Sequence, residues 1–111
     1  MTFNNYQANA GRTAFYPRNF KNEGLYYTTL GLVGEAGEIA NKVKKIMRDN
    51  NGKLEEIHKA DIFDELGDVL WYCASLADEL GVNLEDVAIS NMNKLADRLK
   101  RDTIKGSGDK R

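Results

Sequence analysis

The longest regular pattern in the chain covers residues 22–48 and reads NEGLYYTTLGLVGEAGEIANKVKKIMR. Its apolar residues recur at steps of three, four or seven, which is the spacing of one face of an α-helix. They are Leu25, Leu32, Ala36, Ile39, Val43 and Ile46. The pattern therefore predicts a long amphipathic helix over residues 22–48.

The same spacing returns after a short turn. Residues 49–52, DNNG, tolerate left-handed backbone and predict that the chain reverses there. A second long helix is predicted over residues 54–80 from the spacing of Ile62, Leu66, Val69, Cys73, Leu76 and Leu80. Shorter helices are expected over residues 2–13 and from an Asn83 cap to about Lys100. The sequence thus predicts an all-α fold, four-helix bundle-like, with a long antiparallel helix hairpin.

Size and composition restrict what such a fold can do. The 111 residues fit one domain, expected over residues 1–104, with a flexible tail at 105–111. A net charge of −1 provides no broad positive field, so nucleic acid is not an expected partner. The single Cys73 excludes an intramolecular disulfide and a cysteine-rich zinc site. No secretory signal and no apolar run of about 20 residues is visible, so we expect a soluble cytoplasmic protein without membrane contacts.

Two pairs of carboxylates lie on the predicted hairpin, Glu35 with Glu38 and Glu65 with Asp68. Residues three apart share one helix face, and both pairs lie roughly 18 Å from the turn at the helical rise per residue. Four carboxylates in one small volume repel one another unless a cation is present, and Mg²⁺ is the hard divalent cation that also brings phosphates. The competing interpretation is a solvated acidic face.

Glycines inside the two predicted helices support a crowded site. They are Gly31, Gly34, Gly37 and Gly67, and each costs about 1 kcal/mol relative to alanine in a helix interior. Either another backbone or a ligand is expected to approach them closely. A di-iron carboxylate site normally needs histidines on two helices, and the lone His58 lies far from both acid pairs, so a di-iron site is not expected. His58 is instead expected to be a solvated surface residue.

The sequence resembles a known family in these acids. Glu35-x-x-Glu38, followed by Glu65-x-x-Asp68, is similar to the metal signature of the MazG-like branch of the all-α nucleoside triphosphate pyrophosphohydrolases. The resemblance extends from about Tyr6 to Arg111. It implies hydrolysis of a nucleoside or deoxynucleoside triphosphate to the monophosphate and pyrophosphate with Mg²⁺, or with Mn²⁺ in its place, in a homodimer or a dimer of dimers. The expected role is the cleansing or adjustment of nucleotide pools.

Carried over to this sequence, the resemblance implies that Glu35, Glu38, Glu65 and Asp68 are the Mg²⁺ ligands. Glu38 is the expected catalytic base that activates the attacking water. The resemblance also implies a base contact from Gln7, as in the related dimeric deoxyuridine triphosphatases.

Cations must offset the charge of a bound triphosphate, and several residues are candidates for this role. Asn91, Lys94 and Arg98 share one helix face and resemble the Asn-x-x-Lys segment of the family, although a solvated basic face is an alternative. Lys42 follows Glu38 by one turn and binds either phosphate or only that carboxylate. Tyr72 lies one turn beyond Asp68 and stacks on the nucleoside or packs at a subunit interface.

Two further expectations concern the surface and the tail. Trp71 points away from the acids, so its indole is expected to be exposed and to contact a second subunit. The glycines and cations of the tail suit a lid over phosphates, with an unstructured tail as the alternative. A different class of function is a non-catalytic helical adaptor, whose acidic face binds a metal or a partner.

Overall fold

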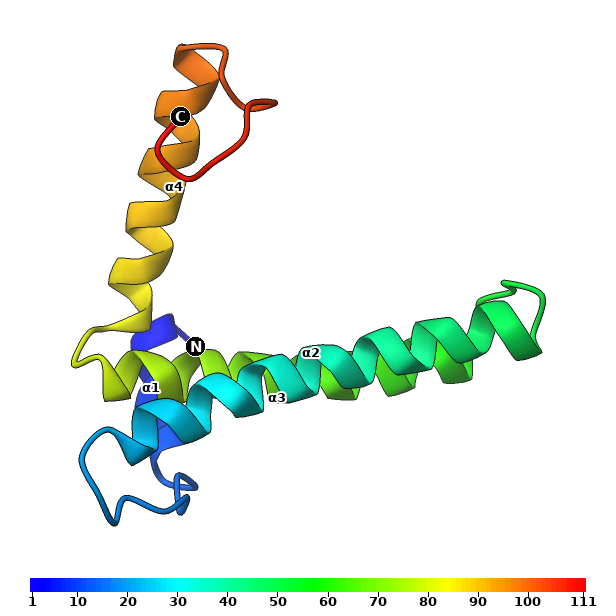
Figure 1. Ribbon diagram of the computed structural model, residues 1–111, viewed down its shortest axis with the longest axis horizontal. Helices are drawn as coiled ribbons and strands as arrows, with labels where there is room; N and C mark the ends of the chain where they lie inside the picture. Colours follow the sequence, from blue (N-terminus) through cyan, green and yellow to red (C-terminus); the bar gives the residue numbers. More distant parts are fainter.

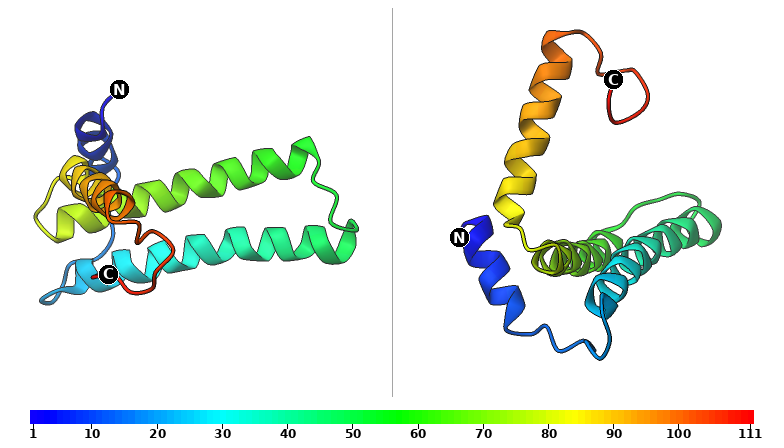
Figure 2. Two further views of the ribbon diagram at one scale, coloured as in Figure 1. Left: turned by 90° about the horizontal axis from the view of Figure 1, so that it is seen from above. Right: turned by 60° about the vertical axis from the view of Figure 1, so that its left-hand side comes forward.

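The computed structural model of the chain describes all 111 residues and consists of four helices without strands. The helices are α1 (Phe3–Gly11), α2 (Glu23–Asp49), α3 (Glu56–Glu79) and α4 (Leu84–Lys100). The predicted all-α class and the long hairpin are confirmed, since α2 and α3 run antiparallel and side by side (Figures 1 and 2).

The hairpin turn forms where the sequence predicts it. Asn51 and Gly52 have φ values of 54° and 75°, which asparagine and glycine adopt more readily than other residues. A capping box then starts α3, because the Glu55 N–H donates to Nδ1 of His58 at 3.0 Å. A related capping box at Thr2 and Asn5 starts α1.

A small core joins α1 to the ends of α3 and α4. It contains Ala10, Ala74, Ala77 and Leu84, with Tyr6, Trp71 and Cys73 packed around it. The side chain of Gln7 completes this junction, because its Oε1 accepts the Leu84 N–H at 2.8 Å and satisfies a free amide at the start of α4. Asn83 occupies the N-cap position as predicted, but its side chain makes no capping hydrogen bond.

From this junction α4 extends away from the hairpin and contacts only α1 and α3 (Figure 1; Figure 2, right). A four-helix bundle around the hairpin is therefore not closed within one chain. The radius of gyration is 17.0 Å, whereas a compact chain of this length has about 13 Å. Residues 105–111, expected to form a flexible tail, make turns that fold back on α4, where Lys94 donates to Asp109. The Arg111 guanidinium donates to the carbonyls of Thr103 and Ile104, just after the helix.

Large apolar side chains remain exposed along all the long helices. Only 11 of the 111 residues are buried, so a single chain has a small core for its length. The exposed residues include Leu30, Val33 and Met47 on α2, Phe63, Leu66 and Leu70 on α3, and Ile89, Met92 and Leu99 on α4. None of the four helices combines the length and the apolar character that a membrane crossing requires.

Candidate metal centre

Three of the four predicted acids meet at the middle of the hairpin. Glu35 comes from α2 and Glu65 and Asp68 from α3, and each offers a carboxylate oxygen within 4.8 Å of the other two. Glu35 and Glu65 are half-buried and Asp68 is exposed. We refer to these three residues as the acid cluster. It exists because the i,i+3 pair on α3 faces α2 at the level of Glu35.

The electrostatics of the acid cluster favour a cation. Burial raises the pKa of Glu35 above its usual value, and a hydrogen bond to Glu65 raises it further. The charges of Asp68, Glu65 and Glu38 act on that pKa in the same direction. A bound cation would relieve this repulsion. Three convergent carboxylates are a hard oxygen donor set, so these residues fit a divalent ion such as Mg²⁺.

Glu38 lies one turn beyond Glu35 on α2 and is exposed. It is not one of the three residues whose oxygens converge within 4.8 Å, although its charge reaches Glu35. The structure therefore separates the predicted acids into three that converge and one that lies beside them.

Lys42 approaches the acid cluster from the side of the hairpin turn. Its Nζ lies 3.8 Å from Oε1 of Glu65, and both side chains are half-buried. An ion pair with Glu38 was one of the two alternatives for Lys42 in the sequence, whereas its ion-pair partner in the structure is Glu65 on α3.

On the other side of the acid cluster stands a group of aromatic rings. Tyr72 packs on the bare backbone of Gly31, where a Cβ would overlap its ring. Tyr27 lies 6.4 Å from Tyr72 between ring centroids and stacks on Tyr16 at 5.3 Å. Burial raises the pKa of Tyr72, as do a hydrogen bond to Tyr27 and the nearby charges of Tyr27, Glu35 and Asp68. Tyr72 is thus at the edge of the acid cluster.

The other three glycines behave differently from Gly31. A Cβ at Gly34, Gly37 or Gly67 would meet no atom within 4 Å. The expected close approach therefore occurs within the chain at Gly31 alone, and the remaining three leave an open helix surface.

Gln7 is used to hold the fold together. Its Nε2 donates to Oδ1 of Asp78 at 2.7 Å and to the carbonyl of Val82 at 3.0 Å, while its Oε1 accepts from Leu84. Asp78 lies about 15 Å along α3 from Asp68 at the helical rise per residue. The structure therefore places the Gln7 amide at the base of α4 and away from the acid cluster.

The predicted cations of α4 are also distant from the acid cluster. Lys94 binds Oδ1 of Asp109 at 2.6 Å, and Arg98 binds the same residue through its carboxylate and its carbonyl. Asn91 is exposed on the same helix. Since α4 extends away from the hairpin and makes no contact with α2, a single chain does not bring these three residues to the acids (Figure 1).

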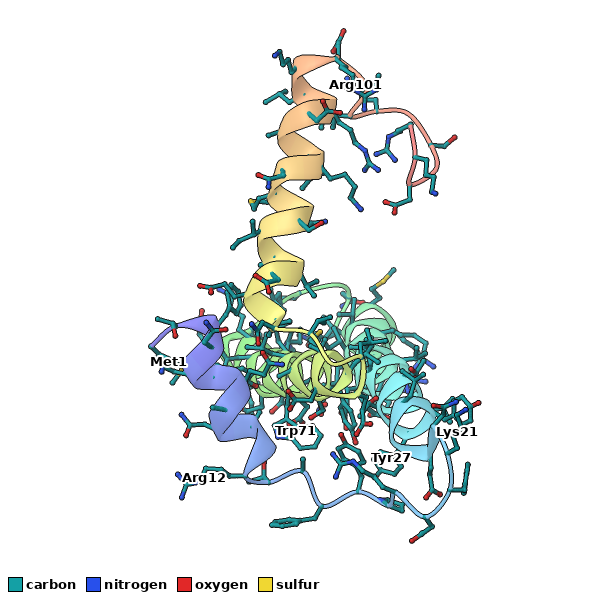
Figure 3. The ribbon with its side chains drawn as sticks, turned by 90° about the vertical axis from the view of Figure 1, so that its left-hand side faces the viewer. Met1, Arg12, Lys21, Tyr27, Trp71 and Arg101 are labelled. Carbon is teal, nitrogen blue, oxygen red and sulfur yellow. The ribbon has the colours of Figure 1, made fainter.

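The expected exposure of the Trp71 indole and of the His58 ring was wrong, whereas the contact of Trp71 with a second subunit stays a prediction. Trp71 is half-buried, and its Nε1 donates to Oγ1 of Thr13 at 2.9 Å, because the loop after α1 passes under the hairpin at this point. Figure 3 shows Trp71 and Tyr27 on the side of the hairpin that faces this loop, with Arg101 at the far end of α4. His58 is half-buried instead of solvated, because its ring caps α3.

The sequence does not reveal one polar cluster, because its members are far apart in the chain. The Tyr16 hydroxyl donates to Oε1 of Glu79 at 2.5 Å, and Nε of Arg18 donates to the same oxygen at 2.8 Å. The Arg18 guanidinium also lies 4.3 Å from the centre of the Tyr16 ring. No spacing pattern could link Glu79 to a loop some sixty residues earlier.

Comparison with known proteins assigns the chain to a family and identifies relatives of similar sequence. Residues 25–102 match the family described as the MazG nucleotide pyrophosphohydrolase domain. The chain is 53% identical over 109 residues to the Gene 37 protein of Mycobacterium phage L5, covering 96% of each chain. It is 39% identical over 74 residues to the uncharacterized protein YvdC of Bacillus subtilis strain 168, covering 62% of this chain and 70% of that protein. No solved structure matches the chain.

Proposed function

This chain belongs to the MazG nucleotide pyrophosphohydrolase domain family, and on that premise we propose that it hydrolyses nucleoside triphosphates to monophosphates and pyrophosphate with Mg²⁺. The observation that carries the proposal is the convergence of Glu35, Glu65 and Asp68 within 4.8 Å on one face of the hairpin. Deoxynucleoside triphosphates are the proposed substrates. The proposed role is to cleanse or adjust the nucleotide pool in the cytoplasm.

Four carboxylates would hold the metal in this proposal. Glu35, Glu65 and Asp68 provide convergent oxygens, and Glu38 adds a further carboxylate at their edge. Mg²⁺ bound there would polarise the phosphate oxygens and lower the pKa of water, and Mn²⁺ would serve in the same oxygen donor set.

The proposed reaction is a displacement at the α-phosphorus. The oxygen of a water molecule forms a bond to this phosphorus, and the bond from the phosphorus to the oxygen bridging to the β-phosphate breaks. Pyrophosphate leaves with that electron pair. Glu38 accepts the proton of the attacking water, because its exposed carboxylate lies beside the convergent acids and remains free to exchange the proton with solvent.

Other residues are assigned to the substrate. In this proposal the Tyr72 ring, which lies at one edge of the acid cluster, stacks on the nucleoside, and Lys42, beside Glu65, binds phosphate. A contact between Gln7 and the base stays a prediction, and it would require the amide to leave its three hydrogen bonds in the fold.

Asn91, Lys94 and Arg98 would bind phosphate only from a second copy of the chain, because α4 extends away from its own hairpin. The exposed apolar side chains of α2, α3 and α4 supply the surface for such an assembly. We therefore propose a homodimer or a dimer of dimers in which α4 of one subunit approaches the acid cluster of another.

The experiment that tests the function is pyrophosphate release from the eight standard nucleoside triphosphates and deoxyuridine triphosphate. Each reaction is run with Mg²⁺ and with EDTA, and monophosphate and diphosphate products are separated. We expect Mg²⁺-dependent formation of monophosphate and pyrophosphate, which Asp68→Asn abolishes. Release of orthophosphate and diphosphate would contradict the proposed cleavage site.

The exposed apolar surface also suits the alternative of a helical adaptor. An adaptor would show no turnover with any nucleotide. Its partner affinity would also be unchanged by Glu38→Gln and Asp68→Asn. The hydrolase loses turnover in both variants.

A further inference from the structure

A cavity of about 430 Å³ lies between α2 and α3, next to the acid cluster on the side of the hairpin turn. Its polar lining comes from Lys42, Lys45, Asp49, Asn50, His58 and Asp61. On α2, Lys42 and Lys45 continue the face of Glu35 and Glu38. On α3, Asp61 and His58 continue the face of Asp68 and Glu65 in the opposite chain direction. The cavity therefore lies along the same helix faces as the acid cluster, and Lys42, whose Nζ is 3.8 Å from Oε1 of Glu65, connects the two.

The two lysines of this cavity are not fully paired with carboxylates, so their ammonium groups are available to a ligand. None of the ion pairs in the chain involves Lys45, and Lys42 is held only at 3.8 Å by Glu65. Asp49 is neutralised mainly by Arg48, which binds both of its oxygens at 2.7 and 2.8 Å, and the charge of Lys45 makes a smaller contribution. A cation that takes over Glu65 would release the Lys42 ammonium toward the cavity.

His58 adds a neutral donor whose tautomer is set by the fold. Its Nδ1 accepts the Glu55 N–H at 3.0 Å, so this nitrogen carries no proton. The ring proton is then on Nε2, which is left without a partner in the chain while the ring lines the cavity. The capping of α3 thus prepares an N–H donor beside Lys42 and Lys45.

We propose that this cavity binds the terminal two phosphates of the substrate and, after cleavage, pyrophosphate. The inference rests on the proposed function and specifies how the substrate is oriented along the hairpin. The Lys42 and Lys45 ammonium groups and the His58 Nε2–H donate to phosphate oxygens on the side of the hairpin turn. The nucleoside then lies on the opposite side of the acid cluster, toward Tyr72 and Tyr27.

Asp61 specifies the form in which pyrophosphate binds. Its carboxylate lines the same cavity, one turn from Glu65, and would repel a bare polyanion. We therefore expect pyrophosphate to bind as its Mg²⁺ complex, because the cation would offset the repulsion between Asp61 and the phosphates. Binding of pyrophosphate without Mg²⁺ should be weak.

The test is calorimetric titration of the full chain with inorganic pyrophosphate, in Mg²⁺ and in EDTA, with no nucleotide present. Lys45→Ala and His58→Asn are each expected to weaken binding about 10-fold, which corresponds to the loss of one charge-assisted hydrogen bond. Asparagine at position 58 can still cap α3, as Asn5 does for α1. Lys44→Ala is the matched control, because Lys44 lines a separate apolar groove on α2.

In steady-state assays the same two variants should show a matching rise in the inhibition constant for pyrophosphate, with inhibition by the monophosphate unchanged. Binding of pyrophosphate that is equal in wild type, Lys45→Ala and His58→Asn would overturn the inference, and so would absence of binding to the wild type. If the wild type binds pyrophosphate through Lys45 but cleaves no nucleotide, the proposed function fails and the anion site stands. If the wild type cleaves nucleotides and both variants bind pyrophosphate normally, only the site fails.

Discussion

Single side chains around the acid cluster have separable roles. Glu35, Glu65 and Asp68 converge, while Glu38 stands beside them with its carboxylate open to solvent. Gly31 matters for a different reason, because the Tyr72 ring occupies the space that a side chain would need. Substitutions at these positions therefore report on chemistry at Glu38 and on packing at Gly31.

Glu38→Gln tests the base. We expect kcat to fall at least about 100-fold even at saturating Mg²⁺ and nucleotide, because the amide cannot accept the proton of the attacking water. Pyrophosphate release measured across nucleotide concentrations checks this. The control is Glu56→Gln, which removes an exposed carboxylate paired with Lys59 at the start of α3 and should leave both constants unchanged. A Glu38→Gln enzyme with normal kcat would remove Glu38 from the proposed mechanism.

Gly31→Ala tests the packing of Tyr72. The new methyl group would overlap the ring, so we expect the free energy of unfolding to fall by about 1–3 kcal/mol, less the gain in helix propensity. Gly34→Ala is the matched control, because its Cβ meets no atom within the chain and should be neutral or slightly stabilising. Urea unfolding followed by circular dichroism measures both. A destabilising Gly34→Ala would indicate that a second chain packs there.

At the level of helices, two polar networks attach the peripheral segments to α3. Tyr16 and Arg18 bind Glu79 at the end of α3, and these bonds anchor the loop between α1 and α2. The hydrogen bond from Tyr16, followed by contacts with Arg18, holds the pKa of Glu79 below its usual value. Burial and the Glu79 contact raise the pKa of Tyr16 to about 12. Gln7 forms the second network at the base of α4.

The Glu79 network predicts a loss of stability in acid. A carboxyl group whose pKa is lower in the folded state stabilises the fold above its unfolded pKa, and this stabilisation disappears as pH falls through the folded value. Urea unfolding between about pH 6 and pH 3 should show this decline in the wild type. In Tyr16→Phe the pH-dependent part of the free energy of unfolding should shrink by roughly 1 kcal/mol. The effect is modest because Glu79 keeps its contact with Arg18, which is partly exposed. Equal pH dependence in both proteins would contradict the assignment.

Gln7→Ala tests the second network. The substitution leaves the Leu84 N–H without its acceptor and the Val82 carbonyl without a donor, so we expect the free energy of unfolding to fall by about 2–3 kcal/mol. Hydrogen exchange at Leu84 should accelerate. Unchanged stability, together with a raised nucleotide KM, would instead support a contact between Gln7 and the base.

The whole chain is extended, and this shape leaves functional groups apart. α4 carries Lys94 and Arg98 away from the hairpin that carries the acids, and the apolar faces between them are uncovered. A second copy can cover those faces and bring its own α4 to the acids. Sedimentation at micromolar concentration with Mg²⁺ should therefore show a dimer or tetramer, and a monomer alone would contradict the proposal.

Mixing two inactive variants tests whether sites are shared between subunits. Glu65→Gln removes an acid and Lys94→Ala removes a cation, so each oligomer alone should lose most activity. In mixed oligomers some sites combine an intact acid cluster with an intact α4, and roughly a quarter of wild-type activity should return. No recovery after verified subunit exchange would show that both residues act within one chain or not at all.

The sequence by itself determined the helices and the meeting of Glu35 with Glu65 and Asp68 across the hairpin, because helical period and rise relate these residues through local geometry. It also located the turn at Asn51 and Gly52, which depends on backbone preference alone. Only the tertiary structure placed Gln7 at the base of α4, turned the Trp71 indole onto Thr13, and gave His58 and Lys45 a common cavity. These contacts depend on how separate segments approach one another, which a periodic pattern within one helix does not specify.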